Sequence, residues 1–231
     1  MKDSLGDRMK SNYEDRTRYS LPRRTFTIIR IDGKAFHSYT INLERPFDNQ
    51  LMNDMNLTAK YLCENIHCSK FAYIQSDEIS ILLTDFDKLN TDAWFDGNIQ
   101  KIVSVSSSLA TGYFNFLRPG KLAFFDSRVF TLPYETEVEN YFLWRQQDCI
   151  RNSIQSVAQS LYSHKELKGK NCNQLQEMIF QKNINWFDYE PKYKRGRGII
   201  KNKETRKWMI SDVPIFNQEP LFFKDIFPIM E

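Results

Sequence analysis

The order in which strand-like and helix-like patterns follow one another limits the folds open to this chain. Residues 24–31 are rich in β-branched side chains and predict a buried strand. Residues 47–67 then carry apolar side chains at near-helical spacing, and two short apolar runs at 71–75 and 79–83 predict a hairpin. The first part of the chain therefore alternates between the two kinds of element.

A second helix and a fourth strand complete this order. Helical spacing returns from Thr91 and stops at Pro119-Gly120, and residues 123–130 form a further strand-like run. Strand, helix, hairpin, helix and strand in this order match the split βαβ arrangement of the ferredoxin-like fold. We therefore predict an α+β protein whose ferredoxin-like βαββαβ palm carries its helices on one face of the sheet. We place this palm-like domain at residues 1–133.

The remainder of the chain, residues 134–231, is predicted to be a helical and basic C-terminal α/β extension that packs on the palm. Residues 138–161 show the spacing of a long helix, and residues 175–180 that of a shorter one. Residues 191–207 are dense in Lys and Arg and contain two glycines, which indicates a basic loop or hairpin rather than a core element.

Composition excludes several classes of protein. No stretch approaches the roughly 18 to 20 uncharged apolar residues that a membrane span needs. Residues 1–20 are charged throughout and lack the apolar core of a secretory signal. We therefore expect no membrane partner and a cytoplasmic location. The four cysteines lack the paired spacing of a zinc site, and we interpret them as reduced, buried thiols.

Two aspartates mark the ends of strands that are neighbours in a ferredoxin-like sheet. Asp32 follows the first strand and Asp77 lies at the turn of the hairpin, so their carboxylates can converge. Two carboxylates that meet in a partly dry site repel each other, so such a pair commonly holds a divalent ion. Mg²⁺ is suited because it takes one or two carboxylates and completes its shell with water and phosphate oxygens. The alternative, that both are ordinary turn residues, stays open.

The turn that follows the first aspartate predicts a phosphate site. Its residues are Gly33, Lys34, Ala35, Phe36 and His37. A tight turn after a strand presents successive backbone N–H groups that can cradle a triphosphate. The pattern of a P-loop is absent, so this phosphate site differs from that of P-loop enzymes. A contact from the histidine to a base or phosphate and a loop histidine without a role remain equal alternatives.

A run of basic residues in the extension predicts a surface for RNA. Its members are Lys192, Lys194, Arg195, Arg197, Lys201, Lys203, Arg206 and Lys207. Aromatic side chains at Tyr193 and Trp208 are interleaved with them and suit stacking on nucleotides. Residues 144–148 (WRQQD), which include Arg145, are a second candidate for contact with RNA or a nucleotide. A solvated basic loop is the alternative.

Four blocks of the sequence together resemble the tRNA-His guanylyltransferase superfamily. They are residues 30–37 (RIDGKAFH), 75–80 (QSDEIS), 125–128 (FDSR) and 144–149 (WRQQDC), in that order. The resemblance implies a polymerase-like palm that adds nucleotides to RNA in the 3′-to-5′ direction. In that family a nucleoside triphosphate first activates the RNA 5′-monophosphate, which the 3′-hydroxyl of the incoming nucleotide then attacks.

The resemblance also implies roles for individual residues. Asp32 and Asp77 would be the catalytic residues and would bind two Mg²⁺ ions, with the Gly33 carbonyl as a further ligand. The turn from Gly33 to His37 would hold the triphosphate of GTP, ATP or another nucleoside triphosphate. The remaining positions that the resemblance places at the nucleotide are Ser76 and Lys101. Family members assemble as dimers of dimers, so we expect a homotetramer that acts on tRNA.

One departure from the family pattern indicates which branch the chain is similar to. The family histidine that follows Asp-Cys is Ile150 here, and Lys34 and Ala35 replace Arg and Gly. These changes favour the guanylyltransferase-like branch, which repairs truncated tRNA 5′ ends by templated addition. Guanylate addition confined to tRNA-His, a nucleotide cyclase-like palm enzyme and a non-catalytic RNA-binding module are the alternatives. The cyclase hairpin motif is absent, and an RNA-binding module would not need the two aspartates.

Overall fold

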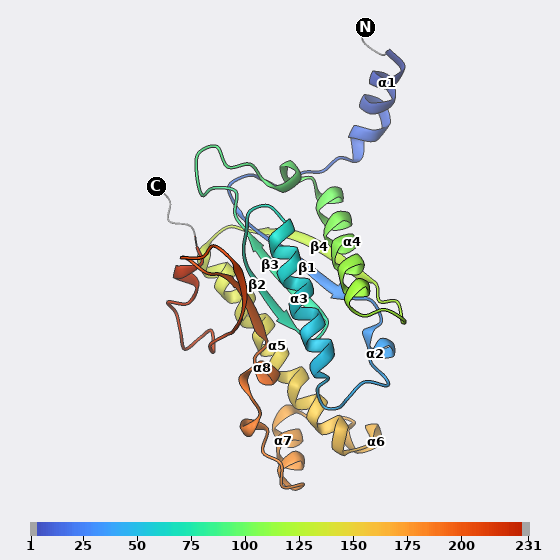
Figure 1. Ribbon diagram of the computed structural model, residues 1–231, viewed down its shortest axis with the longest axis vertical. Coiled ribbons are helices and arrows are strands. Elements are labelled where there is room, and N and C mark those ends of the chain that lie inside the picture. Colours follow the sequence, from blue (N-terminus) through green and yellow to red (C-terminus); the bar gives the residue numbers. More distant parts are fainter. Residues whose placement is uncertain (1–3, 228–231) are drawn as a thin grey trace.

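A single antiparallel sheet organises the protein, whose computed structural model describes residues 4–227 (Figure 1). Its strand order is β4-β1-β3-β2-β5-β6. The strands are β1 (Phe26–Gly33), β2 (Ser69–Gln75), β3 (Glu78–Leu83), β4 (Phe125–Leu132), β5 (Arg197–Lys201) and β6 (Trp208–Asp212). The first four lie in the order of a ferredoxin-like sheet, which confirms the predicted palm.

The central strands are buried on both faces of the sheet. Ile28, Ile29 and Ile31 of β1 are all fully buried, and β3 is buried along its whole length. Because successive side chains of a strand point to opposite faces, a strand that is apolar at almost every position needs cover on both sides.

Two long helices cover one face, as predicted. They are α3 (Asn49–Asn65) and α4 (Ile99–Leu117), which lie side by side across the sheet in Figure 1. Asp48 caps the first by accepting from the Leu51 N–H at 2.7 Å, and Asn98 caps the second by accepting from the Lys101 N–H at 2.9 Å. Such caps satisfy backbone donors that a helix start leaves unpaired.

The C-terminal part of the chain covers the opposite face. Helix α5 (Glu135–Leu161) packs Val138 and Phe142 against this face, where Phe216 and Phe223 join the same core. Strands β5 and β6 continue the palm sheet, because β5 pairs with β2. The extension is therefore joined to the palm through both hydrogen bonds and core packing, and the division of the chain at residue 133 stays a prediction.

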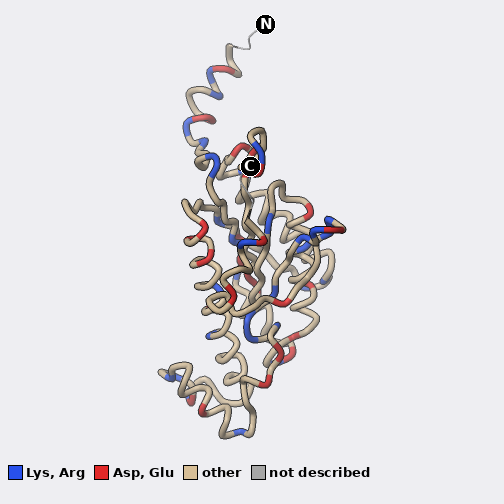
Figure 2. The backbone as a smooth tube through the Cα atoms, turned by 90° about the vertical axis from the view of Figure 1, so that its left-hand side faces the viewer, with Lys and Arg blue, Asp and Glu red and all other residues tan. Residues whose placement is uncertain are grey.

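Short elements complete the described chain. They are α1 (Ser4–Met9), η1 (Lys10–Glu14), η2 (Asp15–Thr17), α2 (Phe36–Tyr39), η3 (Trp94–Gly97), α6 (His164–Leu167), α7 (Cys172–Phe180), η4 (Trp186–Asp188), α8 (Pro191–Lys194) and η5 (Phe223–Asp225). The N-terminal helical segment projects away from the sheet, and acidic and basic residues alternate along it (Figure 2). Among residues 4–227, no helix combines the length and the apolar character that crossing a membrane requires.

Candidate active site

Strand pairing brings the two predicted aspartates to the same end of the sheet. Asp32 lies near the end of β1 and pairs across the sheet with Glu78, the first residue of β3. Asp77 directly precedes Glu78 in the hairpin turn. A Cβ atom placed on Gly33 would lie only 2.7 Å from Asp77 Oδ2, so the Asp77 carboxylate sits against the Gly33 backbone. The three residues predicted to bind metal are therefore neighbours, although 44 positions separate Gly33 from Asp77 in the sequence.

The turns beside the aspartates hold uncommon backbone conformations. Ser76, in the hairpin turn, has a φ of 47°, and Ala35, in the turn after β1, has a φ of 54°. Non-glycine residues seldom adopt this left-handed region. Residues that the surrounding structure holds in such regions concentrate at functional sites. Both turns therefore have a backbone conformation that is common near active sites.

The predicted triphosphate turn is only partly open. The Lys34 N–H donates to the Phe124 carbonyl at 2.8 Å and is therefore occupied. Phe36 packs in the core and is 5% exposed, whereas His37 lines the cleft beside the aspartates. Neither Lys34 nor Ala35 lines that cleft. In the first turn of α2, the Ser38 and Tyr39 N–H groups donate to the Ala35 carbonyl, so the N–H groups of Phe36 and His37 are the ones that can be offered to a phosphate.

A cleft of about 610 Å³ opens where the end of the sheet meets α2 and α5. It is lined by Arg30, Asp32, Phe36, His37, Thr40, Gln75, Ser76, Asp77, Glu78, Arg145, Asp148, Asn152, Gln155, Ser156 and Gln159. Most of these side chains are polar, and they come from three separate stretches of the chain, residues 30–40, 75–78 and 145–159. The cleft therefore has the polar character that a highly charged ligand needs.

Burial changes the acidity of both aspartates. The pKa of Asp77 is raised to about 6, mainly by burial, with smaller increases from the charges of Asp32 and Glu78 and with hydrogen bonds acting in the opposite direction. Burial also raises the pKa of Asp32, with a smaller contribution in the same direction from Asp126. Two carboxylates that repel each other and are shielded from water are strongly stabilised by a bound cation, because the cation balances negative charge that water no longer screens.

The donor set of this site fits Mg²⁺. Within the described part of the chain, no group of three or more His, Cys, Asp and Glu side chains is placed to hold a metal ion. The site offers instead two carboxylates, from Asp32 and Asp77, beside the backbone of Gly33. Mg²⁺ is commonly held by one or two carboxylates, and substrate phosphates and water complete its shell.

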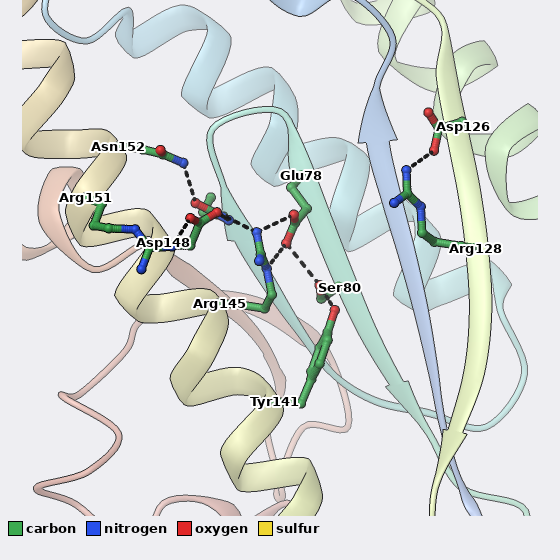
Figure 3. Close-up of polar contacts among 10 residues, drawn as sticks. Glu78, Ser80, Asp126, Arg128, Tyr141, Arg145, Asp148, Arg151 and Asn152 are labelled. Atoms are coloured by element: carbon green, nitrogen blue, oxygen red, sulfur yellow. Dashed lines mark hydrogen bonds and ion pairs between the residues drawn. The ribbon is translucent and has the colours of Figure 1, made fainter. Parts of the chain in front are cut away.

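A buried ion pair supports the hairpin from α5 (Figure 3). Arg145 donates to both Glu78 oxygens, from Nε at 2.8 Å and from Nη2 at 2.7 Å. The same Nη2 donates to Asp148 Oδ2 at 2.7 Å, and Gln75 donates to that oxygen at 3.3 Å. This network fixes α5 against the residues on both sides of Ser76 and Asp77.

Arg145 was predicted to contact RNA or a nucleotide, and the structure shows it largely buried. It is 5% exposed, and two carboxylates accept from its guanidinium group. It also lines the cleft, so its contact with RNA or a nucleotide stays a prediction. The structure places Arg145 as a support for the hairpin.

The predicted RNA contacts of the basic segment differ in exposure. Lys192, Lys194 and Arg195 are half-exposed, and Lys192 forms an ion pair with Glu190 at 3.1 Å. Arg197 is only 5% exposed, because it begins β5 inside the sheet, so its side chain is not on a surface that RNA can reach. The position of Arg197 corrects the prediction that residues 191–207 are a basic loop or hairpin outside the core, because β5 is part of the sheet.

The structure does not bring Lys101 to the cleft. Lys101 lies in the first turn of α4, where its ammonium group is 5.9 Å from the centre of the Phe95 ring. The opposite end of α4 is the one that approaches the site, because Phe114 packs there against Phe36. Lys101 and the two aspartates are therefore at opposite ends of the palm within this chain.

A second pocket, of about 220 Å³, adjoins the cleft. The two share Thr40, Gln75 and Ser76 in their walls. The second pocket is further bounded by residues 43–48, by the start of α3, and by Tyr193 and Arg197. A ligand in the cleft therefore has adjacent space into which it can extend.

The sequence did not reveal two features of the site. One is the buried ion pair of Glu78, for which the spacing of Arg145 and Asp148 on one helix was the available signal of a charge network. Nothing in the sequence marked Glu78 as the partner of that arginine. The second pocket had no signal at all, because residues 43–48 form no motif.

Comparison with known proteins identifies the family. A family model described as tRNAHis guanylyltransferase (Thg1) matches residues 6–133. The tRNA(His) guanylyltransferase of Schizosaccharomyces pombe is 29% identical over 209 residues, which cover 81% of this chain and 78% of that protein.

Two solved structures are similar over almost the whole chain. A bacterial tRNA(His) guanylyltransferase (Thg1)-like protein in complex with ATP is 44% identical, covers 98% of this chain and 100% of its own, and has a TM-score of 0.92. Such a protein in complex with GTP is 43% identical, covers 97% of this chain and 99% of its own, and has a TM-score of 0.86. The resemblance seen in the four sequence blocks is thereby confirmed. Because the family model matches more than half of its residues, the chain belongs to the tRNAHis guanylyltransferase (Thg1) family.

Proposed function

We propose that this nucleotidyltransferase adds nucleotides in the 3′-to-5′ direction to the 5′ end of truncated tRNA, with the opposite strand as template. Family membership supplies the reaction class. The observation that carries the site assignment is the convergence of Asp32 and Asp77 beside Gly33, in a cleft where burial raises the pKa of both carboxyl groups.

The proposed reaction has two stages. A nucleoside triphosphate activates the RNA 5′-monophosphate with release of pyrophosphate, and the 3′-hydroxyl of the incoming nucleotide then displaces the activating group. ATP and GTP, the nucleotides bound in the two solved bacterial relatives, are the substrates that we assign to this cleft. When bound by Asp32, Asp77 and the Gly33 carbonyl, two Mg²⁺ ions would stabilise the attacking oxygen and the leaving pyrophosphate.

The remaining residues of the cleft position the reactants. Arg30 lines the cleft above Trp144, and its buried Nε has no hydrogen-bond partner among the described residues. An arginine in this position offers a donor and a positive charge to phosphate oxygens. His37 and Ser76 lie in the same wall, where their polar groups can hold the triphosphate.

The residue at position 150 supports repair rather than strict guanylate addition. Ile150 packs against the apolar cluster formed by Ile154 and Val157 on α5. An apolar side chain there offers no hydrogen bond with which to select one added base. The high identity with the bacterial Thg1-like proteins favours the same branch. A homotetramer, a cytoplasmic location and contact of the basic segment with tRNA complete the proposal.

Nucleotide addition tests the proposal directly. The protein is incubated with Mg²⁺, labelled nucleoside triphosphates and 5′-truncated tRNAs, and the added bases are read from the products. We expect templated addition by the wild type, and a loss of more than about 100-fold in Asp32→Asn and Asp77→Asn, the scale of removing one strong electrostatic stabiliser. RNA binding should remain, because neither substitution removes a basic group.

A matched control is available on the neighbouring strand. Asp126 pairs with Asp32 across the sheet but does not line the cleft. Asp126→Asn should therefore keep most of the activity. Full activity of either cleft variant would remove the metal-site assignment. Guanylate addition to mature-length tRNA-His alone would instead overturn the assignment to repair.

A further inference from the structure

A buried arginine without a counter-charge lines the pocket beside the cleft. Arg197 is 5% exposed, and its Nε donates to Asn56 Oδ1 at 2.9 Å. Its Nη2 is buried and has no hydrogen-bond partner among the described residues. Burial lowers the pKa of this guanidinium group, which reflects how poorly its surroundings support the charge.

The other buried arginine of the described residues has carboxylate partners. Arg145 is paired with Glu78 and Asp148, and the half-buried Arg118 is paired with Asp54 at 2.9 Å. No ion pair is formed by Arg197 within residues 4–227. A buried cation without a partner is costly, and replacing it with an apolar side chain would be expected to stabilise the fold. The unpaired donors of Arg197 therefore point to a ligand that supplies acceptors.

The pocket that Arg197 lines has the chemistry of a nucleobase site. Pro46, Phe47, Leu51 and Met52 give it apolar walls, and it opens to the cleft through shared residues. Pockets with apolar walls and a few placed polar groups bind flat organic rings and orient them through their edges. If the triphosphate lies at the two aspartates, as the proposed function requires, the base of the same nucleotide reaches this pocket.

The carboxylates in the pocket wall do not replace this ligand. Asp48 is engaged as the cap of α3, where it accepts from the Leu51 N–H at 2.7 Å and from the Glu44 N–H at 3.2 Å. Glu44 also lines the pocket, but it is exposed and makes no ion pair with Arg197. The terminal nitrogens of Arg197 thus remain without acceptors.

We propose that Arg197 selects guanine over adenine in the nucleotide bound beside the two aspartates. The guanidinium group of arginine matches the two acceptors O6 and N7 of guanine, whereas adenine presents an N6 amino donor in place of O6. Adenine would therefore leave a terminal nitrogen of the arginine buried without an acceptor. Sites built to hydrogen-bond a particular group discriminate strongly against ligands that lack it. This inference rests on the proposed function, because it takes the cleft as the triphosphate site.

Equilibrium binding of nucleotides to the full-length protein tests this role. The dissociation constants of GTP and ATP are measured with Mg²⁺ for the wild type and for Arg197→Met, which keeps the length of the side chain. We expect the affinity for GTP to fall by about tenfold or more in the variant, while that for ATP changes little. The variant should melt at the same or a higher temperature, because a buried unpaired charge has been removed.

Nucleotide analogues give a test that needs no substitution. Inosine triphosphate keeps O6 and N7 and should bind the wild type as GTP does, apart from any contact to the 2-amino group. 7-Deaza-GTP lacks N7 and should bind the wild type more weakly than GTP does. It should bind Arg197→Met as tightly as GTP binds that variant. An inosine triphosphate affinity equal to that of ATP would overturn the proposal.

Arg118→Met is the matched control. It removes a half-buried arginine that also contacts α3, but one with a carboxylate partner and outside the pocket. It should lower the melting temperature and leave the ratio of GTP to ATP affinity unchanged. If Arg197→Met weakens both nucleotides equally, Arg197 is only a support for α3 and the inference fails.

Assays of tRNA extension separate this inference from the proposed function. If the wild type extends truncated tRNA but Arg197→Met keeps the wild-type preference between GTP and ATP, the inference alone is overturned. An Arg197-dependent preference for GTP without extension of any tRNA would overturn the proposed function and leave the assignment of Arg197 in place.

Discussion

The carboxyl group of Asp77 links the site to the stability of the fold. Burial holds its pKa at about 6 in the folded protein, compared with an ordinary value of 3.8. Between these two values the folded state binds more protons than the unfolded state, so stability falls as the pH rises through this range. Above the folded pKa the cost of the buried charge is complete, and a bound cation can offset it.

Mg²⁺ should therefore stabilise the protein more at neutral than at acidic pH. We expect the melting temperature of the wild type to rise on addition of Mg²⁺ at about pH 7.5 and to rise much less at about pH 5, where Asp77 is protonated. Thermal denaturation with and without Mg²⁺ measures the difference. Asp77→Asn should abolish the Mg²⁺ effect at neutral pH. Equal stabilisation at both pH values would show that the ion binds elsewhere.

The sequence predicted the site residues better where a motif supported the prediction than where charge alone did. Asp32 and Asp77 were predicted to converge because turn chemistry and strand order together place them at one end of a sheet, whereas the role of Gly33 as a ligand came from the family resemblance. Arg197 looked like part of a solvated run, because local composition does not reveal that a strand begins there and pairs with β2. Lys101 matched a family position, but spacing along a helix does not indicate which end of that helix approaches the site.

At the scale of elements, α5 joins the palm to the rest of the molecule. It contributes to the core on the second face of the sheet through Val138 and Phe142. Further along, Ile154 and Val157 form a separate cluster with α7. Its middle carries the ion pair between Arg145 and the hairpin. The helix therefore connects the apolar core on the second face of the sheet to the residues around the cleft.

Breaking this ion pair should destabilise the fold and the hairpin together. Arg145→Met leaves Glu78 buried without a partner, and we expect the free energy of unfolding to fall by about 3 to 5 kcal/mol. Urea denaturation measures this change. The double variant Arg145→Met/Glu78→Gln should recover much of the loss, because no uncompensated charge remains. If the double variant is as unstable as Arg145→Met, the loss of stability comes from lost packing and not from the unpaired charge.

The elements themselves were largely predictable because their apolar spacing is strong. The hairpin, the two palm helices and the long C-terminal helix lie close to their predicted positions. Strands β5 and β6 were not predicted as parts of the palm sheet. The pairing of β5 with β2 joins residues more than 100 positions apart, for which a local pattern holds no information.

At the scale of the molecule, the half-exposed basic residues after α7 are the candidates for contact with the tRNA backbone. Among the described residues, the Arg195 side chain takes part in no hydrogen bond or ion pair, so it is free to meet a phosphate. Lys88 is exposed beyond the other end of β3, away from the cleft. These two residues provide a pair with the same charge but different positions.

Loss of the Arg195 charge should weaken tRNA binding in a manner that depends on salt. For Arg195→Gln we expect the slope of log affinity against log salt concentration to become shallower by about one phosphate contact. Lys88→Gln should leave the slope unchanged. Filter binding across a range of salt concentrations measures both. Identical slopes for the two variants would assign Arg195 to solubility alone.

The pairing of β5 with β2 has a consequence for how the chain can be divided. Strand β2 ends at the turn that carries Asp77, and without β5 its outer N–H and C=O groups would form a bare sheet edge. Such an edge invites pairing with other polypeptides. A shortened chain that stopped ahead of β5 would thus be prone to self-association at the strand that leads into the turn with Asp77.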